Sequence, residues 1–176
     1  TLVESAVADL GGLDLVVNAA GEGFAPKPVA DLTEADWDAA FGATAKGSFF
    51  VTQAAATHLR QSELGLVVMI EDVAAYQPWP SFAAHCAAKA AQAMLTRVLA
   101  RALAPDVRVC GVAPGSVAVE PGQEERRAAE TLLGRIGSPE DVAEAVAYLV
   151  SANFVTGTTI VVDGGRLLQS AARIFP

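Results

Sequence analysis

Basic residues are scarce in this sequence, and their scarcity excludes one class of function. Twelve Lys and Arg, only three of them Lys, stand against twenty Asp and Glu in 176 residues, which gives a net charge of −8. Proteins that bind a phosphate backbone need clustered Lys and Arg. We therefore expect no nucleic-acid partner.

Long hydrophobic runs and cysteine frameworks are missing as well. Apolar residues make up 52% of the chain, but no run approaches the roughly twenty residues that cross a bilayer, and no secretory signal is visible at the N-terminus. Cys86 and Cys110 have neither metal-ligand spacing nor a disulfide pattern, so we expect small buried thiols in a reducing cytoplasm, without a metal or a membrane partner. The length suits one α/β domain over residues 1–176.

The sequence does contain a regular alternation of helix and strand. Short runs rich in Val and Ile predict buried strands at Leu13–Ala19, Leu66–Ile70, Val107–Val112 and Thr158–Val162. Helices are expected at Leu2–Leu10, at Trp37–Gln61 after a cap at Thr33 and with a kink at Gly42 or Gly47, at Phe82–Ala104, and from Ser138 to Ser151. This order predicts a doubly wound α/β fold with a parallel sheet.

In such a sheet, ligands bind beyond the carboxyl ends of the strands. The residues that follow the four predicted strands are Asn18-Ala19-Ala20-Gly21, Glu71-Asp72, Ala113-Pro114-Gly115-Ser116-Val117 and Asp163-Gly164-Gly165. Ordinary turns and solvated loop charges are the alternative interpretation of these segments.

His85 and Lys89 lie four residues apart on a predicted helix, so their side chains share one face. The Lys89 ammonium disfavours protonation of the imidazole, whereas a nearby Asp72 carboxylate favours it. Opposing influences of this kind are typical of a catalytic acid or base. A partly exposed His and Lys on a helix face would show the same spacing.

Several motifs in register resemble the short-chain dehydrogenase/reductase family over nearly the whole chain. They are Asn18–Gly21, His85–Lys89, Val112–Gly115, Gly137–Ala143, and Val155–Gly157 with Val162–Gly165. The resemblance implies a Rossmann-type fold, an NAD or NADP cofactor, and hydride transfer to or from a carbonyl or imine. It also implies homodimers or homotetramers formed through helices 37–61 and 82–104. The cofactor-binding residues that it implies are Asn18, Ala19, Ala20, Gly21, Lys89, Pro114, Gly115, Ser116 and Val117.

The chain departs from the family at its start. The family opens with a strand and a glycine-rich turn that holds the cofactor pyrophosphate, but no G-x-x-x-G-x-G or G-x-G-x-x-G occurs here. We expect the chain to be the C-terminal part, of about four strands, of a longer three-layer α/β/α domain; the alternative is a truncation completed by a partner. The Leu13–Ala19 strand would then present an unpaired apolar edge.

The family's catalytic tetrad is also altered. Lys89 matches the lysine, but His85 stands at the tyrosine position, Asp72 at the serine position and Thr44 at the asparagine position. An Asp at the serine position resembles the pteridine reductase branch. The prediction is an NAD(P)-dependent oxidoreductase that acts on a carbonyl or a pterin-like imine through Asp72, His85, Lys89 and Thr44.

The alternative to an enzyme is a catalytically silent member of the family that serves as a binding or structural subunit. Three altered tetrad positions favour this alternative. The polar segment Ala118–Thr131 is expected to form a mobile flap over the site, and with Trp79 it suggests a flat or apolar small-molecule substrate.

Overall fold

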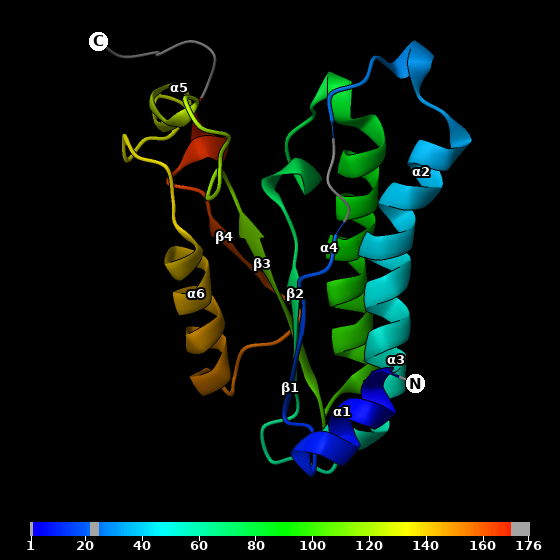
Figure 1. The fold of residues 1–176 in the computed structure, drawn as a ribbon. Coiled ribbons are helices and arrows are strands. Elements are labelled where there is room, and N and C mark those ends of the chain that lie inside the picture. The colour runs from blue at the N-terminus through cyan, green and yellow to red at the C-terminus, as the bar shows by residue number, and fades with distance from the viewer. Residues whose placement is uncertain (1, 22–24, 170–176) are drawn as a thin grey trace.

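The computed structural model describes residues 2–21 and 25–169, and its centre is a four-stranded parallel sheet (Figure 1). The strands β1 (Leu15–Asn18), β2 (Leu66–Ile70), β3 (Arg108–Pro114) and β4 (Thr159–Val162) pair in the order β1-β2-β3-β4. The predicted α/β fold with a parallel sheet is confirmed. The predicted bounds are right for β2, whereas β1 is shorter than expected and β3 extends to Pro114.

Helices cover both faces of this sheet. They are α1 (Leu2–Leu10), α2 (Glu34–Phe41), α3 (Gly47–Leu59), α4 (Ala83–Leu103), α5 (Glu124–Ala128) and α6 (Pro139–Ser151). Figure 1 shows α1, α3 and α4 on one side of the strands and α6 on the other. Among the described residues, no helix is long and apolar enough to cross a membrane.

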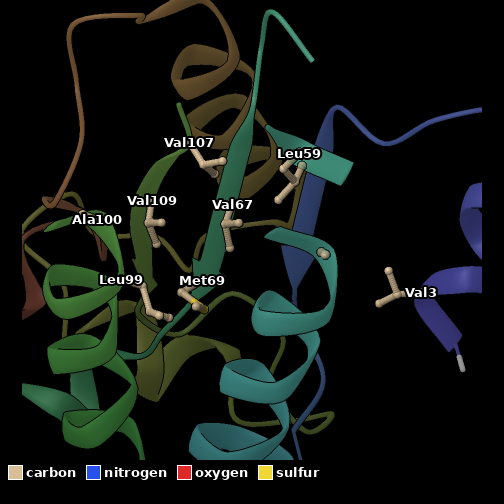
Figure 2. Close-up of a cluster of buried hydrophobic side chains, with 9 residues drawn as sticks. Val3, Leu59, Val67, Met69, Leu99, Ala100, Val107 and Val109 are labelled. Carbon is tan, nitrogen blue, oxygen red and sulfur yellow. The ribbon is translucent and has the colours of Figure 1, made fainter. Parts of the chain in front are cut away.

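Alternate residues of β2 supply two separate hydrophobic cores. Val67 and Met69 pack with Leu59 of α3 and Leu99 of α4, as Figure 2 shows, whereas Leu66 and Val68 belong to the core under α6. All four β2 side chains are fully buried. A strand that is buried on both faces is uniformly apolar, which is why its bounds could be predicted.

Two capping boxes fix the starts of α2 and α6 as predicted. The side chains of Thr33 and Ser138 each accept a hydrogen bond from the backbone N–H three residues on. The carboxylates of Asp36 and Asp141 accept hydrogen bonds from the backbone N–H groups of Thr33 and Ser138. Such a pair satisfies two backbone donors that a helix start would otherwise leave without partners.

The predicted single helix over 37–61 is wrong in detail. Two α-helices, α2 and α3, are separated by a π-helical segment, η2 (Gly42–Lys46), at the place where a kink was expected. A Cβ added to Gly47 would lie only 3.2 Å from the Gly42 carbonyl oxygen. Thr44 is buried in this segment, and π-segments of this kind interrupt the regular hydrogen-bond pattern.

One further expectation needs correction. The helix expected over Phe82–Ala104 is α4, and Phe82 belongs instead to a short 3₁₀ turn, η4 (Pro80–Phe82). The segment expected to form a mobile flap contains α5, and its role as a flap stays a prediction. Its acidic first turn and basic last turn complement the helix dipole, a local signal that the high polarity of the segment concealed.

A buried carboxylate at the end of β2 lies beside the middle of β3 and the start of β4. Glu71, which follows β2, is only 2% exposed, and its side chain accepts hydrogen bonds from Thr96 Oγ1 at 2.6 Å, Tyr76 Oη at 2.9 Å and Thr159 Oγ1 at 3.1 Å. Burial raises the pKa of the Tyr76 phenol, which keeps its donor proton. Gly111 of β3 makes room for this cluster: a Cβ there would collide with Glu71 Oε1 and lie 2.7 Å from Thr159 Oγ1.

We therefore expect Gly111→Ala to destabilise the fold by about 1–3 kcal/mol, the usual cost of forcing extra volume into a packed interior. The measurement is the free energy of unfolding from a urea titration. Gly12→Ala is the matched control, because a Cβ at Gly12 meets nothing within 4 Å. Equal stability of Gly111→Ala and Gly12→Ala would show that the Glu71 cluster does not constrain the sheet.

Candidate functional site

Asp72 and His85, thirteen residues apart in the sequence, come into contact beyond the end of β2. Asp72 caps a short 3₁₀ turn, η3 (Val73–Ala75), by accepting the Ala74 backbone N–H at 2.8 Å. Its Oδ2 lies 3.3 Å from Nε2 of His85, which sits in the first turn of α4 and is 9% exposed. A carboxylate only accepts, so the contact places a proton on Nε2 of the imidazole.

Lys89 lies one helical turn further along α4 and is 8% exposed. Its Nζ donates to the Ile70 carbonyl oxygen at 2.8 Å and to Gln92 Oε1 at 3.2 Å. Burial lowers the pKa of the Lys89 ammonium, and the charges of Asp72 and Glu71 oppose that effect. The helix thus presents an imidazole and an ammonium to the edge of the sheet.

Thr44 joins this group only indirectly. Its carbonyl oxygen accepts the Ser48 hydroxyl at 2.6 Å, and Ser48 Oγ in turn accepts the amide of Gln92 at 2.8 Å. The backbone of Thr44, rather than its side chain, is therefore connected to Lys89. Sequence analysis missed Gln92 and Ser48, although Gln92 stands three residues after Lys89, a spacing that puts both on one helix face.

Glu71 and Asp72, adjacent in the sequence, have different surroundings. The Glu71 side chain is enclosed by hydroxyl groups inside the fold, whereas Asp72 faces His85. The interpretation of Glu71 as a solvated loop charge is also wrong, because 98% of its surface is covered. Glu71 is a structural group beside the site.

The candidate cofactor residues lie at the same edge of the sheet. Asn18 is buried, and its amide donates to Thr52 Oγ1 of α3 at 3.1 Å and to Met69 Sδ of β2 at 3.3 Å. The residues that follow it, Ala19, Ala20 and Gly21, are exposed. A Cβ at Gly21 would meet nothing within 4 Å, so a ligand can approach this backbone closely.

The second candidate segment, Pro114–Val117, begins at the last residue of β3. A Cβ at Gly115 would lie 2.8 Å from the Cβ of Asp163, so only glycine lets the turns after β3 and β4 pack this closely. Exposed backbone beyond β1 and half-buried backbone beyond β3 flank the buried Lys89. Backbone that a ligand can approach closely beside a buried ammonium is compatible with a dinucleotide bound beyond the strand ends.

An aromatic ring links this site to the far end of the sheet. The Trp79 indole is nearly parallel to the His85 ring, at 8°, with centroids 6.5 Å apart. The Arg166 guanidinium lies over the Trp79 ring, 5.0 Å from its centroid. The same guanidinium donates a hydrogen bond to Ser116 Oγ at 3.0 Å and forms an ion pair with Glu130 at 2.9 Å. Arg166, which sequence analysis missed, thereby connects the segment after β4 to the loop between β2 and α4.

A cavity of about 200 Å³ borders His85 and Thr44. Its walls include Ala39, Ala40, Leu32 and Phe82, and Lys27 pairs with Asp36 at 2.5 Å beside them. The Lys27 ammonium lowers the pKa of the Asp36 carboxyl, and the two opposite charges largely neutralise each other. Such a cavity suits a small, uncharged group rather than an anion or a cation.

In the part of the chain that the structure describes, no three or more His, Cys, Asp or Glu side chains cluster in a way that could hold a metal ion. The fold defines a Rossmann-type α/β protein, in which ligands bind beyond the carboxyl ends of the parallel strands. The candidate acid–base residues, Asp72 and His85, lie at that edge of the sheet.

Comparison with known proteins gives the family. A family model described as enoyl-(acyl carrier protein) reductase matches residues 1–166. The chain is 35% identical to 4-formylbenzenesulfonate dehydrogenase of Comamonas testosteroni, over 94% of this chain and 71% of that protein. It is 36% identical to 3beta-hydroxysteroid dehydrogenase 1 of Eggerthella lenta, over 95% of this chain and 68% of that one.

The solved structure of 7 alpha-hydroxysteroid dehydrogenase with NADH superimposes with a TM-score of 0.86, at 30% identity, over 93% of this chain and 68% of that one. The chain belongs to the short-chain dehydrogenase/reductase family and is an NAD(P)-dependent oxidoreductase of that family.

The contact between Arg166 and Trp79 can be tested by fluorescence. Trp37→Phe leaves Trp79 as the only tryptophan, since the chain has two. In that background we expect Arg166→Met to increase acrylamide quenching of Trp79 and to cost about 1–2 kcal/mol of stability, because it removes a partly desolvated cation–π contact. The exposed Arg101, mutated to Met, is the control. Identical quenching in the two variants would mean that Arg166 does not cover the indole.

Proposed function

We propose that this protein interconverts an alcohol and a carbonyl on a small, uncharged substrate, with His85 exchanging the proton. The observation that carries the proposal is the contact between Asp72 and His85 beside the cavity at the strand ends. Relatives support the reaction class: their names include a 3beta-hydroxysteroid dehydrogenase and a cyclopentanol dehydrogenase. The volume and the balanced charges of the cavity support the substrate class.

The proposed role of Asp72 is to orient the imidazole. It accepts the Nε2 proton, so the ring gains and loses its second proton at Nδ1. Hydride transfer to a carbonyl would leave negative charge on the substrate oxygen, and the His85 imidazolium would neutralise it by donating a proton. An imidazolium is a stronger acid than the phenol found at this position in the family, and histidine is the commonest general acid.

The remaining roles concern the cofactor. NAD(P) carries the hydride, and Lys89 would bind its nicotinamide ribose hydroxyls, with Asn18–Gly21 and Pro114–Val117 lining its path. Thr44, at the family's asparagine position, would contribute through its backbone carbonyl, because that oxygen is already part of the hydrogen-bonded chain that ends at Lys89.

Reduction of a pterin-like imine is the second candidate, and one observation favours it. An Asp occupies the position beyond β2 where the pteridine reductase branch also has Asp, and here it contacts the proton-transfer residue. A panel that contains a secondary alcohol, its ketone and a dihydropterin separates the two substrate classes. Turnover of the dihydropterin alone would replace the alcohol proposal.

His85 distinguishes an active enzyme from a silent subunit. We expect His85→Ala to reduce turnover by about 10²-fold or more, the usual contribution of a general acid, with little change in NADH or NADPH affinity. His85→Tyr should retain activity and move its optimum to higher pH, because a phenol is the weaker acid. Steady-state rates and cofactor fluorescence titrations provide the measurements. Equal rates for the parent and His85→Ala would refute the catalytic role, and failure to bind either cofactor would favour the silent subunit.

We also propose that α3 and α4 form the contact with a second copy of the chain. These helices lie side by side (Figure 1), and Phe50, Met94 and Val98 on them are 51–55% exposed. Large apolar side chains gathered on neighbouring helices are typical of subunit interfaces.

Met94→Glu should therefore convert a dimer or tetramer into a smaller species, because it buries a charge in the apolar contact. Light scattering at micromolar concentration measures the mass. Leu10→Glu alters an exposed apolar residue at the end of α1, away from α3 and α4, and should leave the mass unchanged. A parent protein that is already monomeric would contradict the proposal.

The thiols support a reducing compartment, such as the cytoplasm, as the place where the protein acts. Cys86 and Cys110 are both free, and Cys110 is buried. Burial raises the pKa of the Cys110 thiol, which keeps it in the unreactive protonated form.

A further inference from the structure

Gln92 is a fully buried polar side chain that lies one helical turn after Lys89 on α4. Its Oε1 accepts a hydrogen bond from Lys89 Nζ at 3.2 Å, and its Nε2 donates to Ser48 Oγ at 2.8 Å. Ser48 Oγ donates onward to the Thr44 carbonyl oxygen at 2.6 Å. A continuous hydrogen-bonded chain thus runs from Lys89 on α4 to the π-helical segment before α3.

The direction of donation along this chain is fixed by chemistry. An ammonium only donates and a carbonyl only accepts, so both ends of the chain have one possible polarity. The amide must then present its oxygen to Lys89 and its NH₂ to Ser48. A rotated amide would put a donor against the ammonium and break two bonds at once, which holds Gln92 in one orientation.

We propose that Gln92 is a positioning residue for Lys89. This inference rests on the proposed function in one respect only, the contact with the cofactor that is assigned to Lys89. Gln92 and the Ile70 carbonyl oxygen hold two of the three ammonium protons from fixed directions. The remaining N–H therefore has one direction in which to donate. A long, flexible lysine side chain would otherwise lose considerable conformational entropy each time it engaged a ligand hydroxyl.

The charged and titratable groups around Lys89 are few. Asp72 and Glu71 face it from beyond β2, and His85 lies one turn earlier on α4. Ser48 and Thr44, which lie on the side of η2 and α3, carry no charge. A substitution at position 92 should therefore change the pKa of Lys89 directly, because Gln92 contacts the ammonium and no other charged group lies in the hydrogen-bonded chain.

The test uses the lysine signals themselves. The chain has only three lysines, Lys27, Lys46 and Lys89, so NMR of ¹³C-labelled lysine gives three signals that Lys27→Arg and Lys46→Arg assign. Gln92→Leu should lower the pH midpoint of the Lys89 titration, because the ammonium loses an acceptor. Gln92→Glu should raise it, because a carboxylate replaces the amide oxygen.

Two further readouts separate positioning from packing. Gln92→Leu should reduce kcat/KM by roughly tenfold, the effect of losing one hydrogen bond to a charged group, and Gln92→Glu should restore part of it. Ser48→Ala, which removes only the far end of the chain, should shift the Lys89 midpoint in the same direction as Gln92→Leu and by less. It tests the inference if Gln92→Leu fails to fold. Gln61→Leu and Gln61→Glu, at an exposed position, are the matched controls.

A lower melting temperature in Gln92→Leu with an unchanged Lys89 midpoint would overturn the inference, because the role would then be structural. An unchanged midpoint in Ser48→Ala together with an unchanged one in Gln92→Glu would overturn it too. If the parent protein bound neither NADH nor NADPH, the proposed function would fail, whereas the titration would still decide whether Gln92 positions Lys89.

Discussion

The parallel pairing of four buried strands is the constraint on which the rest of this structure depends. Parallel strands need helices on both faces, and here α3 and α4 supply one cover and α6 the other. The same pairing brings the carboxyl ends of all four strands to one edge of the sheet. Groups far apart in the sequence, such as Asp72, His85 and Arg166, therefore meet in one region without any long insertion.

Burying that edge places polar groups inside the protein, and hydrogen bonds offset the cost. Within the described part of the chain, every buried side-chain nitrogen and oxygen has a partner. Glu71 has hydroxyl donors from three elements, and Gln92 connects two helices. An unsatisfied buried polar group costs about 1–3 kcal/mol, so each of these side chains also fixes the packing around it. The groups beside the proposed catalytic residues thus stabilise the fold and limit motion at the site.

The sequence predicts those elements whose signals are local. The bounds of β2 follow from an apolar run and those of α6 from Ser138, Pro139 and Asp141, because a cap and a proline mark a helix start unambiguously. The sequence predicted a kink between α2 and α3 but not the π-helical segment, since the helix-forming pattern continues through η2 and only two glycines interrupt it. Tertiary packing around the buried Thr44, which no local rule describes, selects the π-segment there.

The candidate site also contains residues that local signals predicted and residues that they could not predict. Asp72, His85 and Lys89 were predicted from their positions after a strand and on one helix face, and the structure brings Asp72 and His85 into contact. Their roles stay predictions. The burial of Glu71 could not be foreseen, because it depends on Gly111, forty residues away on the next strand, having no side chain. Arg166 was missed for a similar reason, since its contact with Trp79 spans the sheet.

Asp72 and His85 are chemically matched, and this match bears on whether the altered tetrad is active. A carboxylate accepts but does not donate, so opposite a tyrosine it bonds only the protonated phenol, whereas a serine hydroxyl can also donate to the phenolate. Opposite an imidazole the carboxylate is well suited, because Nε2 remains a donor whether the ring is neutral or charged. In the proposed mechanism the contact would therefore persist while the ring gains and loses a proton at Nδ1. Random loss of function at one position would leave a mismatched neighbour, and the matched pair consequently supports an active proton-transfer site over a silent one.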